Sequence, residues 1–153
     1  MAYLITGGTG LIGSNIIRHL VKEGEQVVVY DWFPEKSLLE QLLNEDEKTR
    51  VKIVQGDVTD LPHLIHTVKE NDVNIIIHMA GLLVEDSKAN PPLAVKINCE
   101  GTINVFETAR LLGLRKVVWA SSMSVFFGAQ AKYPEEYVPN DAPPLSAHNL
   151  FSV

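Results

Sequence analysis

The residues that could do chemistry begin with a glycine-rich turn near the N-terminus. Thr6 to Gly13 reads TGGTGLIG, with glycines in the spacing GxxGxxG. An apolar run of strand length precedes the turn and a segment with helical spacing follows it, the setting in which such a turn binds phosphates. Glycine lets the main chain approach a pyrophosphate closely, and the helix N-terminus offers free N–H groups. The turn predicts a dinucleotide site whose phosphate-binding residues are Gly7, Gly10, Leu11, Ile12 and Gly13.

An aspartate at the end of the next apolar run supplies a second part of such a site. Asp31 lies 18 residues after Gly13, close to the roughly 20 residues expected for the acid that accepts hydrogen bonds from the adenosine ribose. A carboxylate there would repel a 2′-phosphate, and no Lys or Arg stands between Asp31 and Pro34 to neutralise one. The pattern favours NAD over NADP as cofactor. The alternative is that Asp31 only caps a turn or a helix.

The elements that must position these residues alternate between strand-like and helix-like segments. Apolar runs rich in Val, Ile and Leu occur at 2–6, 26–30, 51–55, 73–78 and 116–122. Such runs without polar alternation are typical of parallel strands that are buried on both faces. We therefore expect an α/β fold, a Rossmann-type doubly wound parallel sheet of about five strands in the order 3-2-1-4-5.

The predicted helices follow from apolar spacing and from their stop signals. Residues 11–23 and 92–113 carry apolar residues at helical spacing and are followed or ended by a glycine. The charged amphipathic stretch 34–50 predicts a third helix, and Asp60 is a candidate cap for a fourth that runs to Lys69.

Composition excludes several classes of protein. The 153 residues include 19 acidic and 13 basic side chains, for a net charge of −6 at pH 7, and the basic residues are scattered. Nucleic acid and anionic membrane surfaces are therefore not expected as partners. A single cysteine, Cys99, and five histidines without ligand spacing predict no disulfide and no metal site. No signal peptide or membrane helix is recognisable, so a cytoplasmic location is expected.

Six motifs in a fixed order carry a family resemblance. They are TGGTGLIG, Asp31, Gly56-Asp57-Val58, His78-Met79-Ala80-Gly81, the run from Asn98 to Val105, and Ala120-Ser121-Ser122. Together they resemble the extended short-chain dehydrogenase/reductases, and in particular the NAD-dependent epimerase/dehydratase family, which includes nucleotide-sugar 4-epimerases. The resemblance covers the chain from Ala2 to about Gly128.

The resemblance implies a role for each matched residue. Asp57 and Val58 would hold the adenine, although Asp57 could equally cap the following helix. The small turn formed by Met79, Ala80 and Gly81 would leave room for the ribose and the diphosphate. Near the nicotinamide, Asn98 would help to organise the active site. Ser122 would be the catalytic serine that hydrogen-bonds the substrate oxygen, and Ser121 would lie beside it on the cofactor side. The alternatives are a solvent-facing Asn98 and ordinary turn serines.

The family's chemistry also requires a Tyr-x-x-x-Lys pair, in which the Lys lowers the pKa of the Tyr hydroxyl for proton exchange with a substrate alcohol. The sequence contains no such pair, and Phe151 stands where the resemblance would place the Tyr. We therefore expect an NAD-binding domain at 1–128, followed at 129–153 by a Pro-rich surface loop that leads into a truncated active-site helix. We expect that the substrate domain is not part of this sequence and that the chain is a fragment of a longer enzyme.

The implied function is that of the NAD-binding domain of an oxidoreductase that acts by hydride transfer on a nucleotide sugar or a related carbinol. The chain by itself is not expected to be competent. The alternative is a non-catalytic NAD-binding or sensing module. A methyltransferase that uses S-adenosylmethionine shares the glycine loop and the acid, but Ala-Ser-Ser after the fifth strand favours the dehydrogenase. The helix at 92–113 matches one that the family uses in dimer contacts, so a homodimer is one expected arrangement.

Overall fold

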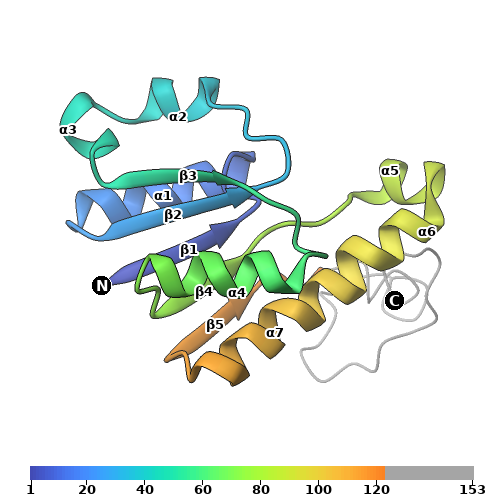
Figure 1. The fold of residues 1–153 in the computed structure, drawn as a ribbon. Coiled ribbons are helices and arrows are strands. Elements are labelled where there is room, and N and C mark those ends of the chain that lie inside the picture. Colours follow the sequence, from blue (N-terminus) through green and yellow to red (C-terminus); the bar gives the residue numbers. More distant parts are fainter. Residues whose placement is uncertain (123–153) are drawn as a thin grey trace, which may run out of the picture.

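The five strands form one parallel sheet, as the alternation of segments predicts. The computed structural model describes residues 1–122 (Figure 1). The strands are β1 (Ala2–Thr6), β2 (Gln26–Asp31), β3 (Val51–Gln55), β4 (Ile75–His78) and β5 (Lys116–Trp119). Their order is β3-β2-β1-β4-β5, and every pair is parallel. The predicted doubly wound α/β sheet and its strand order are confirmed.

The order of the strands creates a switch point beside β1. The last residue of β1, Thr6, is aligned with Tyr30 of β2 on one side and with His78 of β4 on the other. The chain leaves β1 towards one edge of the sheet and returns to β4 on the opposite side of β1. Because parallel strands all end at the same edge, the loops after β1, β2 and β4 diverge around one crevice, where ligands of open α/β sheets bind.

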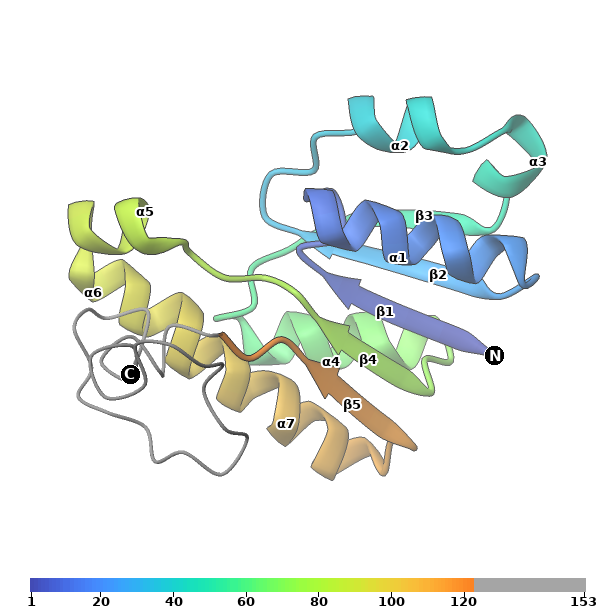
Figure 2. The same ribbon diagram turned by 180° about the vertical axis from the view of Figure 1, so that it is seen from behind.

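Helices cover both faces of this sheet (Figures 1 and 2). One face carries α1 (Leu11–Lys22), α2 (Ser37–Leu42) and α3 (Glu45–Lys48), and the other carries α4 (Leu61–Glu70) and α7 (Gly101–Leu112). Successive strand residues point to opposite faces. In β1, Leu4 packs in the core cluster beneath α4 and α7, whereas its neighbour Ile5 packs in the cluster beneath α1. Each face therefore has an apolar core of its own.

The helix expected over residues 34–50 forms as two short helices instead. Leu43 is in an extended conformation between α2 and α3, with φ −112° and ψ 137°. Asn44 then starts a new helix, because its side chain accepts a hydrogen bond from the Glu47 amide while the Glu47 carboxylate accepts one from the Asn44 amide. This reciprocal cap satisfies two N–H groups that a continuous helix would pair differently.

The helix expected over residues 92–113 is also more complex. It begins one residue earlier as α6 (Pro91–Ala94), passes through a π-helical segment, η1 (Val95–Glu100), and continues as α7 to Gly113, whose φ is +63°. A short helix, α5 (Val84–Ala89), precedes it. π-Helical turns accommodate an extra residue and occur frequently at functional sites. The interruption contains Asn98.

The expectation of strands buried on both faces applies to the centre of the sheet. The central strands β1, β2 and β4 are mostly buried, whereas β3 and β5 lie at the edges and are more open. The strand β5 ends at Trp119, so Ser121 and Ser122 follow it instead of belonging to it. The expected boundary at Gly128 and the segment 129–153 lie outside the described residues. Within residues 1–122, every helix is too short or too polar to cross a membrane.

Candidate functional site

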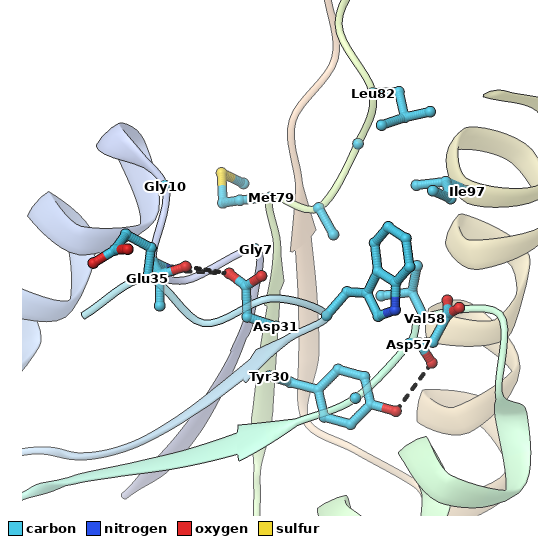
Figure 3. A pocket seen from close by; sticks show the side chains of 15 residues that line it. Gly7, Gly10, Tyr30, Asp31, Glu35, Asp57, Val58, Met79, Leu82 and Ile97 are labelled. Atoms are coloured by element: carbon cyan, nitrogen blue, oxygen red, sulfur yellow. Dashed lines mark hydrogen bonds between the residues drawn. The ribbon is translucent and has the colours of Figure 1, made fainter. Parts of the chain in front are cut away.

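A cavity of about 420 Å³ opens at the carboxyl ends of the strands, at the switch point (Figure 3). Its walls come from the glycine turn after β1, the end of β2, and the loops after β3 and β4. The fifteen lining residues are Gly7, Thr9, Gly10, Tyr30, Asp31, Trp32, Glu35, Gly56, Asp57, Val58, Met79, Ala80, Gly81, Leu82 and Ile97. The fold thus brings together residues of the glycine turn, Asp31, the pair Asp57 and Val58, and the turn after β4.

At two positions of the glycine turn, residues 7–13, a Cβ would come closer than 3.0 Å to backbone atoms. Gly7 has φ +63°, and a Cβ on it would lie 2.8 Å from the Ala80 nitrogen. A Cβ on Gly13 would lie 2.6 Å from the carbonyl oxygen of Gly7, so Gly13 lets the first turn of α1 rest directly on the loop. Gly7 therefore lines the cavity, and Gly13 supports the loop from behind it.

The N-terminus of α1 meets the cavity without a side-chain cap. Gly10 is the N-cap residue, and the first turn carries no acidic side chain. The side chains of Leu11 and Ile12 are 73% and 64% exposed and are not part of the cavity lining. The groups that these two residues could offer to a ligand in the cavity are therefore their backbone N–H groups. A helix N-terminus with free N–H groups and a partial positive charge suits a phosphate.

The Asp31 carboxylate lies at the end of β2, facing the glycine turn (Figure 3). Its Oδ2 atom accepts hydrogen bonds from the Thr9 amide at 3.1 Å and from the Thr9 hydroxyl at 2.7 Å, and its Oδ1 atom accepts a longer one of 3.4 Å from Phe33 N. A carboxylate has about four acceptor positions, so Asp31 can still accept from a ligand hydroxyl. Asp31 fastens the glycine turn to β2 and keeps acceptor capacity in the cavity.

A second acid lies close to the same end of the cavity. Glu35 lines the cavity together with Asp31, and its carboxylate accepts a hydrogen bond from the Ser37 amide, which lowers the pKa of Glu35. None of the fifteen described lining residues is basic. A phosphate group at this end of the cavity would therefore lie close to two carboxylates, with no basic side chain among the lining residues to compensate its charge.

Asp57 and Val58 form the wall opposite Asp31 (Figure 3). The Asp57 carboxylate accepts a hydrogen bond from Thr59 N at 2.8 Å, whereas the cap of α4 is Asp60, which accepts from His63 N at 3.0 Å. The alternative that Asp57 caps the helix is therefore wrong. The Tyr30 hydroxyl donates to the Asp57 carbonyl at 3.0 Å, and burial raises the pKa of Tyr30 well above its usual value. This contact joins the ends of β2 and β3.

The turn after β4 closes the remaining side of the cavity with Met79, Ala80 and Gly81. Asn98 does not line the cavity. Its Oδ1 atom accepts from the Leu82 amide at 2.8 Å, and its Nδ2 group donates to the Leu82 carbonyl at 3.1 Å. A solvent-facing role for Asn98 is therefore wrong, because its side-chain amide is paired with the backbone of this turn.

The two predicted serines lie after β5, away from the cavity lining. Ser121 is exposed and Ser122 is half-buried. They follow the strand next to β4, at the same edge of the sheet as the cavity. Their predicted contacts with substrate and cofactor remain predictions.

Some cavity residues were missed by the sequence reasoning. Thr9 lies inside the glycine motif itself, and Leu82 directly follows the motif that ends at Gly81, so extending that motif by one position would include it. Trp32 and Glu35 follow Asp31 closely, and the carboxylate of Glu35 was a readable signal. Ile97 carried no signal, because an apolar residue in a helix usually packs in the core.

The arrangement of charge and shape fits an adenosine dinucleotide. Free N–H groups lie at one side of the cavity, carboxylates lie at the end of β2, and apolar Val58 and Ile97 offer surfaces for a flat ring. Because Gly7 has no side chain, the glycine turn lies directly against the backbone of the turn after β4.

Comparison with known proteins supports this interpretation of the site. The sequence profile of the 3-beta hydroxysteroid dehydrogenase/isomerase family matches residues 4–142. UDP-glucose 4-epimerase of Mycolicibacterium smegmatis is 33% identical over 150 residues, which are 96% of this chain and 47% of that protein. The 3 beta-hydroxysteroid dehydrogenase type 7 of Rattus norvegicus is also 33% identical over 150 residues, covering 96% of this chain and 43% of that protein.

Solved structures share the same fold. The UDP-glucose-4-epimerase from Stenotrophomonas maltophila, with bound NAD and formylated UDP-arabinopyranose, superposes with a TM-score of 0.82 at 25% identity, over 99% of this chain and 44% of that one. The L-threonine dehydrogenase of Clostridium difficile has a TM-score of 0.79 at 28% identity, over 99% of this chain and 44% of that one. The resemblance to epimerases inferred from the motifs is confirmed. The chain spans less than half the length of these relatives.

Proposed function

The chain belongs to the 3-beta hydroxysteroid dehydrogenase/isomerase family, and we propose on that premise that its cavity binds NAD. The chain would then be the cofactor-binding portion of an epimerase/dehydratase-type oxidoreductase. One observation carries the proposal: the Asp31 carboxylate and the uncapped N-terminus of α1 lie on the same cavity, joined through Thr9. A ribose acceptor and a phosphate site at this separation in the sequence are typical of dinucleotide binding.

The proposed roles follow the cavity from one wall to the other. The backbone N–H groups at Leu11 and Ile12 hold the diphosphate beside the N-cap residue Gly10, whose own N–H donates to the Gly7 carbonyl. Gly7 keeps a side chain out of the cavity, and Gly13 lets α1 pack against the loop from behind. Asp31 accepts from the adenosine ribose, and Glu35 adds to the negative charge that disfavours a 2′-phosphate.

The adenine and nicotinamide ends of the cofactor require different residues. Asp57 and Val58 flank the adenine, and the turn of Met79, Ala80 and Gly81, supported by Asn98, faces the second ribose. NAD supplies a hydride acceptor and donor when it is bound. The chain's own residues bind it, orient it and exclude bulky side chains from its diphosphate.

The substrate is proposed to be a nucleotide sugar or a related carbinol. The relatives' names include UDP-glucose 4-epimerase, a hydroxysteroid dehydrogenase and L-threonine dehydrogenase, so family membership alone does not select a substrate. Nucleotide-sugar epimerases are favoured because they recur among both the sequence relatives and the structural relatives. Ser122 would hydrogen-bond the substrate oxygen, with Ser121 on the cofactor side.

Binding is tested by titration calorimetry of the full 153-residue chain with NAD and with NADP. The chain is expected to bind NAD more tightly than NADP. Asp31→Asn keeps the size of the side chain and removes its charge, so NAD affinity should fall about tenfold and the preference over NADP should shrink. Asp46→Asn, on α3, is the matched control and should leave both affinities unchanged. Absence of NAD binding, or an Asp31→Asn chain that behaves like the control, would contradict the proposal.

One observation favours a second function, a cofactor-binding or sensing module without turnover: the sequence has no Tyr-x-x-x-Lys pair. A single-turnover experiment distinguishes the two by following nicotinamide absorbance after nucleotide sugars are added to the NAD-loaded chain. Binding without reduction supports the module for this chain. Reduction of the nicotinamide would establish catalysis and would require a proton acceptor other than that pair.

A homodimer is also proposed, with α7 as its contact surface. Ile103 is 64% exposed, and Leu111 on the same helix is 51% exposed. Sedimentation of the chain and of Ile103→Glu checks this, with a concentration-dependent dimer expected only without the substitution. A monomer at all concentrations would exclude the dimer.

A further inference from the structure

A buried line of polar side chains runs behind the cavity, from the end of β1 to the helix that carries Asn98. Thr6 and His78 are aligned neighbours at the ends of β1 and β4. The Thr6 hydroxyl lies 2.6 Å from Nδ1 of His78, and Nε2 of His78 lies 3.1 Å from the hydroxyl of Thr102 on α7. Thr6 is fully buried and His78 is 4% exposed, so these groups bond to one another and not to bulk water.

One arrangement of protons satisfies the whole line. The Thr102 hydroxyl donates to the carbonyl of Asn98 at 2.7 Å, so its oxygen must accept from Nε2–H of His78. Nδ1 of a neutral imidazole is then an acceptor, and the Thr6 hydroxyl donates to it. The Thr6 oxygen in turn accepts from the amides of Met79 and Ala80, each at 3.2 Å.

The same line ends on both sides at the turn after β4. At one end, Thr6 holds the amides of Met79 and Ala80. At the other end, Thr102 holds the backbone of Asn98, and the Asn98 side chain forms two hydrogen bonds with Leu82. Residues 79–82 line the cavity, and the amides of Ala80 and Leu82 donate to side-chain oxygens instead of to a neighbouring strand. The position of this turn therefore depends on side chains that do not themselves line the cavity.

We infer that His78 and Thr102 are positioning residues, which set the place of the turn at 79–82 and thereby shape the nicotinamide side of the cavity. This inference rests on the proposed NAD site for its functional meaning, but its geometry stands in the free protein. Burial lowers the pKa of His78 to about 4. The ring is therefore neutral near pH 7 and keeps one donor and one acceptor, as the line requires.

The test separates the two sides of the cavity by ligand. AMP reports on the purine side alone, and NAD reports on both sides. Thr102→Val removes the acceptor of His78 and the donor to Asn98, and should weaken NAD about tenfold with AMP changed less than about twofold. Thr102→Ser keeps the hydroxyl and should restore NAD binding. Calorimetry on the full chain gives both affinities.

The same helix provides a matched control. Thr108 on α7 is fully buried, and its hydroxyl has no hydrogen-bond partner within the described part of the chain. Thr108→Val makes the same chemical change without breaking the line, so both affinities should stay unchanged. Equal weakening of AMP and NAD by Thr102→Val would show a general loss of structure and would overturn the inference. Unchanged NAD binding would overturn it as well.

A measurement without any ligand keeps the inference separate from the proposed function. Amide hydrogen exchange in the free chain should be faster at Ala80 and Leu82 in Thr102→Val, unchanged there in Thr108→Val, and unchanged in the core strands of both. Uniform acceleration, or no acceleration at the two amides, would contradict a positioning role. If the chain binds no NAD but shows the local acceleration, the proposed cofactor fails and the positioning of the turn stands.

Discussion

Two walls of the cavity are built by opposite means. The glycine wall, residues 7–13, rests on direct contact between main-chain atoms, and a Cβ at Gly13 would come within 2.6 Å of a carbonyl oxygen. The turn wall, residues 79–82, is held in place by hydrogen bonds to side chains: the Ala80 amide donates to the Thr6 hydroxyl oxygen, and the Leu82 backbone pairs with the Asn98 side chain. The glycine wall depends on the absence of side chains at its glycines, and the turn wall depends on polar side chains that form hydrogen bonds. Substitutions should therefore break the first abruptly and loosen the second in steps.

The largest effect is expected on the glycine wall. Gly13→Ala should lower the free energy of unfolding by about 3 kcal/mol, because the added methyl group meets backbone that cannot move aside. Gly10→Ala is the matched control: its φ is −69°, and its Cβ would lie 3.4 Å from the nearest atom, which is ordinary contact. Its effect in urea unfolding should stay within about 1 kcal/mol, the cost of alanine in place of glycine at an N-cap. Equal losses in the two variants would mean that backbone contact does not distinguish the walls.

The next effect concerns the turn wall and depends on pH. Burial lowers the pKa of His78 from 6.5 to about 4. Below pH 6.5 His78 is therefore protonated in the unfolded chain but stays neutral in the folded chain. The free energy of unfolding decreases as the pH falls from 6.5 towards 4. His78 alone should lower the free energy of unfolding by about 2 kcal/mol when the pH falls from about 7 to about 5.

Urea unfolding of the wild-type chain and of His78→Gln at the two pH values checks this contribution. The variant should be less stable at neutral pH but should lose less on acidification. A parallel loss in both chains would exclude His78 as the source. Should the variant not fold, the NMR titration of the His78 ring in the wild-type chain decides, since a midpoint near 6.5 would contradict its burial.

A smaller and more local effect is expected at Asn98. Asn98→Ala removes both hydrogen bonds to Leu82 and should lower stability by about 1.5 kcal/mol. The exchange of the Leu82 amide should accelerate more than that of the β2 amides. Asn15→Ala, which removes an exposed hydrogen bond to Leu11 on α1, is the control and should cost less than about 0.5 kcal/mol. An unchanged Leu82 amide would show that Asn98 does not hold the turn.

The smallest effect is expected where the glycine wall uses a side chain. Thr9→Val removes the hydroxyl that donates to Asp31 at 2.7 Å but keeps the amide that donates to the same oxygen at 3.1 Å. The loss of stability should be about 0.5–1 kcal/mol, and Thr9→Ser should recover most of it. If Thr9→Ser loses more stability in urea unfolding than Thr9→Val, the methyl group and not the hydroxyl matters.

The sheet could be predicted from the sequence because its signals are local. Apolar runs at the centre of a parallel sheet are continuous, and the glycines and acids at strand ends follow directly in the chain. The break between α2 and α3 could have been read from the Asn44 and Glu47 pair. The π-helical segment could not, because residues 92–113 are spaced as for an ordinary helix and the extra residue is stabilised by contacts elsewhere in the fold.

The sequence predicts residues of the cavity only where they lie in a recognisable motif. Asp31 and Val58 could be placed from strand ends, but the partners of Asn98 could not, since Leu82 lies 16 residues earlier in the chain. His78 belongs to one of the motifs, but its hydrogen-bond partners Thr6 and Thr102 lie 72 and 24 positions away in the chain. Such contacts are set by strand order and helix packing, which no local pattern records.

The π-helical segment has a consequence for insertions and deletions. Asn104 on α7 donates to the carbonyl of Val58 at 3.0 Å, and Asn98 on η1 accepts from the Leu82 amide. The continuous helix formed by η1 and α7 therefore contacts both the loop after β3 and the turn after β4. Each residue advances a helix by about 100°. Deleting Glu100 would let the segment close as an ordinary helix, with Asn104 still at Val58 and Asn98 rotated away from Leu82. The number of residues between Asn98 and Asn104 therefore determines whether both side chains can reach their partners, Leu82 and Val58.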